Sequence, residues 1–156
     1  MIDYLATVLV FFIYNILTAV SANLTLGYLG LFNLGLIALI GIGAYCYALF
    51  MELGLGFFPS TLLAIIIPGL FAIGLQYLTR KLKGDYFGIA TLGFTYLVFA
   101  ILVNADFTRG ALGIPGISKP IIFGYEFASP LQFLLFSTII LVIILFLVYR
   151  LVNSRF

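Results

Sequence analysis

Residues 27–45 read GYLGLFNLGLIALIGIGAY, with glycines at positions 27, 30, 35, 41 and 43. The segment lies within residues 4–51, the longest stretch of the chain that has no charged side chain. A stretch of this length holds two helical membrane crossings of about 20 residues each. Irregular backbone at membrane depth persists only where protein or water satisfies its freed polar groups. We therefore expect the helix to break near residues 27–35 and a pathway through the membrane to pass there.

The composition of the whole chain excludes a soluble protein. Of its 156 residues, 65% are hydrophobic and 8% are charged, whereas soluble domains carry about 25% charged residues. The bilayer must therefore be the solvent, and membrane lipid is the first expected partner. A net charge of +2 is too small to indicate nucleic-acid binding.

The charged residues divide the chain into apolar stretches, which predict an all-α, polytopic membrane protein of one domain over residues 1–156. A helical span needs about 20 apolar residues, so the stretches hold about five spans. The Gly-broken segment near 27–35 separates the first two spans, and a long outer loop, 105–129, precedes the last. The expected spans are residues 4–26, 31–51, 58–79, 86–104 and 130–150.

Basic residues near the span ends predict the orientation, because cytoplasmic loops carry an excess of Lys and Arg. The short connection at 80–83 holds three basic residues, and the tail holds Arg150 and Arg155. Both are therefore expected on the cytoplasmic side. Five crossings then place the N-terminus and the 105–129 loop outside. If residues 27–35 form a re-entrant turn instead of separating two crossings, the N-terminal side flips.

Small and polar residues gather on one face of several spans. In the fourth span Gly88, Thr91 and Thr95 form a stripe, and in the second Ala44 and Ala48 form a small-xxx-small pair. Such stripes permit close helix packing and hydrogen bonding in lipid, and they also line translocation paths. The first span carries a similar face: Asn15, Thr18, Ala19, Ala22 and Thr25.

The chain lacks the residues that catalysis and metal binding need. It has no histidine, one cysteine at position 46, and five scattered acidic residues. It also lacks the G-x-x-x-x-G-K-[ST] loop that holds nucleotide phosphates. We expect no catalytic residue, no metal site and no cofactor, and hence not an enzyme.

Four segments together resemble a known family. They are residues 22–35 (ANLTLGYLGLFNLG), 41–45 (GIGAY), 80–94 (RKLKGDYFGIATLGF) and 108–117 (TRGALGIPGI). In order and spacing they are similar to the membrane permease subunits of branched-chain amino-acid ABC importers of the LivM type. Relative to that family, the chain resembles the N-terminal half of a permease.

The resemblance implies a multi-pass protein of the cell membrane that forms part of the substrate path of an importer. The implied partners are a second permease chain, cytoplasmic ATPase subunits and an extracytoplasmic solute-binding protein. ATP hydrolysis would then take place on a separate chain, and the substrate would be a branched-chain or related amino acid. A small structural or assembly protein that transports nothing is the alternative, and an independent channel of several copies is a third. The residues expected to line the path are Tyr28, Asn33, Tyr45, Thr91 and Thr95, and those expected to form the backbone break are Gly27, Gly30 and Gly35.

Overall fold

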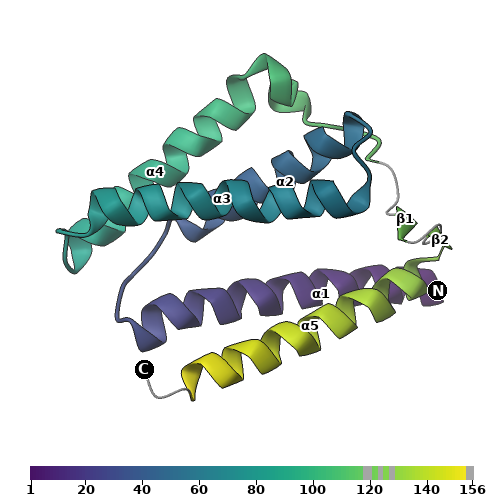
Figure 1. Ribbon diagram of the computed structural model, residues 1–156, viewed down its shortest axis with the longest axis horizontal. Coiled ribbons are helices and arrows are strands. Elements are labelled where there is room, and N and C mark those ends of the chain that lie inside the picture. The colour runs from purple at the N-terminus through teal and green to yellow at the C-terminus, as the bar shows by residue number, and fades with distance from the viewer. Residues whose placement is uncertain (118–120, 123–124, 127–128, 154–156) are drawn as a thin grey trace. The chain divides into compact units, whose positions relative to one another are not determined.

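A computed structural model of the chain describes residues 1–117, 121–122, 125–126 and 129–153, and confirms the predicted all-α fold class. Along these residues five α-helices follow one another, with short 3-10 turns and two minimal strands between the fourth and the fifth (Figure 1). The elements are α1 (Ile2–Asn23), the π-helical turn η1 (Leu24–Tyr28), α2 (Leu36–Glu52), α3 (Phe57–Thr79), α4 (Asp85–Asn104), η2 (Asp106–Thr108), η3 (Gly110–Leu112), β1 (Ile121–Ile122), β2 (Tyr125–Glu126) and α5 (Pro130–Val152).

Within the described part of the chain, four helices are long and apolar enough to cross a membrane. They are Asp3–Tyr28, Phe57–Thr79, Asp85–Asn104 and Pro130–Val152. Helix α2 is shorter, with 17 residues, and so extends about 25 Å against a hydrocarbon core of about 30 Å. The second span was expected to begin at residue 31, but α2 begins at Leu36. The chain between η1 and α2 is not helical.

The chain divides into two compact units, one of residues 1–21 and 126–156 and the other of residues 22–125. The first unit contains most of α1 and all of α5. Helix α5 begins with a capping box at Ser129, whose hydroxyl accepts from the Leu131 N–H while Gln132 Oε1 accepts from the Ser129 N–H, each at 3.3 Å. Pro130 occupies the first helical position, where its missing N–H costs no hydrogen bond. The sequence Ser-Pro-Leu-Gln thus starts this span sharply.

The second unit contains α2, α3 and α4, and its buried core is formed by Ala38, Ile42 and Val98. Helices α2 and α3 approach closely at Gly43, where an added Cβ would lie 3.2 Å from the Ala64 carbonyl oxygen. Pro68 lies four residues after Ala64 within α3 and has no N–H to donate to that carbonyl. Glycine on one helix and proline on the other therefore let the two backbones meet.

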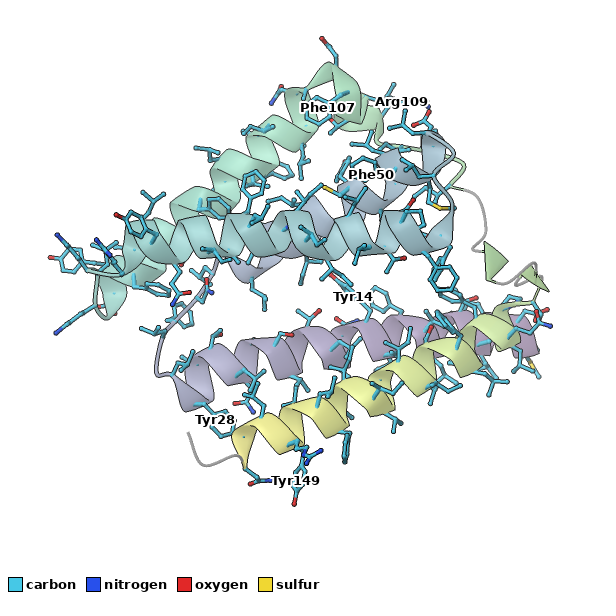
Figure 2. All side chains as sticks on the ribbon, viewed as in Figure 1. Tyr14, Tyr28, Phe50, Phe107, Arg109 and Tyr149 are labelled. Carbon is cyan, nitrogen blue, oxygen red and sulfur yellow. The ribbon has the colours of Figure 1, made fainter. Side chains whose placement is uncertain are left out.

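At the end of α2, an ion pair between Glu52 and Arg109 holds the start of the outer loop. Arg109 is labelled in Figure 2. Arg109 has a left-handed backbone with φ of 60°. Beside it Thr108 is fully buried, and its hydroxyl donates to the carbonyls of Leu102 and Ala105, both at 2.7 Å. The first part of the predicted 105–129 loop is thus ordered against α2 and α4. Residues 118–120, 123–124 and 127–128 of that loop, and Arg155 of the tail, lie outside the described residues.

Candidate functional site

The backbone break predicted from the glycines lies at residues 29–35, named here the broken segment. It follows η1, where an added Cβ on Gly27 would lie 2.3 Å from the Asn23 side-chain oxygen, so a larger residue at this position would require the Asn23 side chain to move. Gly30 has φ of +65°, a conformation that glycine adopts without steric cost. The turn at Gly30 lets the Leu31 N–H donate to the Thr25 carbonyl at 3.0 Å, which satisfies one of the carbonyls left open where the helix ends.

Two threonines of α4 hold the backbone of the broken segment at Leu34. The Leu34 N–H donates to Thr91 Oγ1 at 3.1 Å, and Thr95 Oγ1 donates to the Leu34 carbonyl at 2.8 Å. The Thr91 hydroxyl also lies 3.0 Å from the carbonyls of Phe87 and Gly88, to which it donates. Thr91 and Thr95, named here the threonine clamp, therefore satisfy both polar groups of one peptide residue.

Glycines at positions 35 and 88 let the neighbouring residues of the broken segment pack closely against α3 and α4. An added Cβ on Gly88 would lie 3.3 Å from Phe32 Cδ1, and one on Gly35 would lie 2.9 Å from Leu75 Cδ2. The Gly35 N–H is bonded within the segment, to Asn33 Oδ1 at 2.9 Å. The stripe predicted on the fourth span, Gly88 with the two clamp threonines, is thus the surface on which the broken segment packs.

The threonine clamp supplies the hydrogen bonds that the non-helical backbone at Leu34 would otherwise lack inside a membrane. An unpaired peptide group in hydrocarbon costs several kcal/mol, and a threonine hydroxyl both donates and accepts. Thr91 is fully buried and Thr95 is half-buried, so water has little access to replace these bonds. The arrangement fixes irregular backbone beside α4 without any charged group.

A cavity of about 210 Å³ lies beside the broken segment, within the second unit. We name it the polar cavity, because four of its lining side chains carry uncharged hydrogen-bonding groups while the rest are apolar. Its polar lining residues are Thr25, Asn33, Gln76 and Thr79, and its apolar ones are Leu29, Leu31, Leu39, Ala72, Leu75 and Phe87.

The structure brings together some of the predicted path residues and separates others. Asn33 lines the polar cavity, and Thr91 and Thr95 form the clamp next to it. Tyr28 ends η1 with an exposed side chain (Figure 2), and lines none of the cavities described here. Tyr45 instead lines a separate, apolar cavity of about 190 Å³ between α2, α3 and α4.

Three polar residues that line the polar cavity were not among the predicted path residues. Thr25 belongs to the polar face predicted for the first span, so the sequence carried a signal for it. Gln76 and Thr79 lie near the end of α3. The only polar residues in the second half of that apolar helix are these two and Tyr77, which is the signal that reveals them.

Comparisons with known proteins agree with the resemblance. Residues 4–156 match the family model described as "Branched-chain amino acid transport system / permease component". The chain is 37% identical over 115 residues to the high-affinity branched-chain amino acid transport system permease protein LivM of Salmonella typhimurium, and 36% identical over 115 residues to LivM of Escherichia coli.

Each of these alignments covers 72% of this chain but only 27% of the relative, so the matched stretch is little more than a quarter of either LivM protein. No solved structure matches the chain. The family model, in contrast, covers nearly every residue, from Tyr4 to Phe156. The chain therefore belongs to the permease family of branched-chain amino acid transport systems.

Proposed function

We propose that the chain forms part of the transmembrane path of an ABC importer for branched-chain or related amino acids. The observation that carries the proposal is the broken segment held on α4 by the threonine clamp. Broken helices in transporters line the substrate site, because only a protein-lined or water-lined cavity tolerates non-helical backbone. Membership of the permease family supports the same role.

The partners in this proposal are a second permease chain, a pair of cytoplasmic ATPase subunits and an extracytoplasmic solute-binding protein. This chain would contribute path-lining residues and no chemistry of its own. Asn33 and the clamp threonines are its central path residues, with Tyr28 and Tyr45 as further candidates.

The proposed orientation places Arg80, Lys81 and Lys83 in the cytoplasm and the N-terminus outside. These three basic residues lie in the short connection between α3 and α4, where the positive-inside rule gives its clearest signal. The polar cavity borders the end of α3 and so belongs to the cytoplasmic half of the path in this orientation.

Purification through an affinity tag on this chain, followed by reconstitution, tests the proposal. We expect ATPase subunits to co-purify, and proteoliposomes of the complex to accumulate leucine only when ATP and the solute-binding protein are supplied. Deletion of the gene should also lower leucine uptake by the cells. If no ATPase co-purifies and deletion leaves leucine uptake unchanged, the chain is a structural membrane protein instead.

A further inference from the structure

We propose that the polar cavity is a water-accessible subsite for a small, amphiphilic solute with no net charge. The inference rests on the proposed function, since it assigns a solute subsite to a cavity of the path. It adds where the solute binds, which side chains recognise it, and the expectation that solutes with net charge are disfavoured.

The volume of the cavity matches a single small solute. An engineered cavity of about 150 Å³ binds benzene, which has six heavy atoms. By linear scaling, the polar cavity of about 210 Å³ holds roughly eight heavy atoms. This is the size of one small amino acid and well below that of a dipeptide.

The polar residues of the lining offer hydrogen-bonding groups that the protein does not fully use. Thr25 and Thr79 donate their hydroxyl protons to the carbonyls of Ala22 and Leu75, at 2.9 and 2.7 Å, so their oxygens are left to accept. Among the described residues, the amide of Gln76 makes no hydrogen bond. The lining therefore offers both donors and acceptors to a ligand.

The amide of Asn33, another residue of the lining, is held by a hydrogen bond. Its oxygen accepts from the Gly35 N–H at 2.9 Å, and its amide nitrogen makes no hydrogen bond with the described residues. The same hydrogen bond closes the turn before α2. The Asn33 side chain therefore belongs both to the cavity lining and to the hydrogen bonding of the broken segment.

The rest of the cavity lining is hydrocarbon. Four leucines, an alanine and Phe87 form it, so an apolar group of the solute can be desolvated against them while its polar end meets the amides and hydroxyls. A lining with both polar and apolar side chains matches a molecule with one polar and one apolar end.

None of the described residues that line the cavity is charged. The nearest basic residue in sequence, Arg80, holds its guanidinium 4.2 Å over the centre of the Tyr77 ring, and so is engaged outside the lining. A solute with net charge would meet no counter-charge in the cavity and would be penalised by its desolvation. A zwitterion or a neutral solute escapes most of that penalty, because its own dipole can be matched by the lining.

Cysteine accessibility tests the inference in native membranes, where any partner subunits are present. The single native cysteine is first removed by Cys46→Ala, and then Gln76→Cys is compared with Leu78→Cys. Leu78 lies on the same helix two residues away, does not line the polar cavity and is 77% exposed. Alkylation by iodoacetamide, a small neutral reagent, is followed by the mass of the purified chain.

We expect Gln76→Cys to react roughly tenfold faster than Leu78→Cys, because a thiolate forms in water and not in hydrocarbon. Leucine should slow the reaction of Gln76→Cys, whereas lysine and aspartate should not. Equal reaction rates of the two variants, or equal protection by leucine and lysine, would overturn the proposal.

A charge-exchange variant examines the selection rule directly. With Thr25→Cys as the reporter, the change Gln76→Glu should make lysine protect the thiol and should weaken protection by leucine. Protection by leucine alone in that variant would rule out Gln76 as a recognising group. If the chain supports leucine uptake but these thiols are inaccessible, only the subsite fails. If they are accessible and protected but uptake does not depend on the chain, only the proposed function fails.

Discussion

Thr91→Val removes the acceptor of the Leu34 N–H while it keeps the shape of the side chain. Thr91 is fully buried, so water has little access to replace the lost bond of 3.1 Å. A buried donor left unpaired costs about 1–3 kcal/mol, and hydrogen bonds measured inside a membrane protein average about 0.6 and reach about 1.7 kcal/mol. We take about 1–2 kcal/mol, which shifts the equilibrium between the held and the released segment roughly 5- to 30-fold.

Hydrogen exchange followed by mass spectrometry, on the chain in lipid nanodiscs, measures this shift locally. The peptide that contains Leu34 should exchange faster in Thr91→Val by that factor, whereas Thr91→Ser, which keeps the hydroxyl, should resemble the parent chain. Thr138→Val is the matched control, because among the described residues the Thr138 hydroxyl bonds only the Leu134 carbonyl of its own helix, at 2.8 Å. Unchanged exchange at Leu34 in Thr91→Val would refute the assignment of Thr91 as a clamp.

Three further changes test the packing around the site and the helix ends. Gly35→Ala places a Cβ 2.9 Å from Leu75 Cδ2, and such overpacking should lower the free energy of unfolding by about 1–3 kcal/mol. SDS-induced unfolding followed by circular dichroism measures this loss, and an unchanged midpoint would contradict the close contact. Glu52→Gln should cost less than about 1 kcal/mol, because the side chains of Glu52 and Arg109 are 45% and 48% exposed; a loss that is larger and independent of salt would contradict an exposed pair. Ser129→Ala removes the α5 cap and should cost about 1 kcal/mol, seen as faster amide exchange in the first turn of α5, with no change there as the opposing result.

Much of the fold was accessible from the sequence because lipid imposes a simple pattern. Spans must be long and uncharged, so the charged residues at 80–85 marked the end of α3 and the start of α4, and Pro130 marked the start of α5. The bounds of α3 and α4, Phe57–Thr79 and Asp85–Asn104, differ from the expected spans by one residue at most. Glycine at positions 27, 30 and 35 also located the break.

Tertiary contacts could not be predicted, because they join residues far apart in the chain. Composition gives no reason why Thr91 and Thr95 should bond the backbone of Leu34, some sixty positions earlier. The stripe that contains these threonines was visible, but the same stripe is consistent with helix packing and with a path. The early start assigned to the second span has a similar cause, since residues 31–35 carry no charge and the long-range contacts that favour their non-helical backbone cannot be read from the sequence.

Leucine uptake by cells that lack the native chain tests the central claim most directly. The cells are complemented with the parent chain, with Thr91→Val/Thr95→Val, or with Thr138→Val, each at equal abundance in the membrane. The account predicts that the parent chain and Thr138→Val restore uptake, while the double variant restores little because the broken segment is released from α4. Full uptake with the double variant would contradict the claim that the clamped segment lines the substrate path.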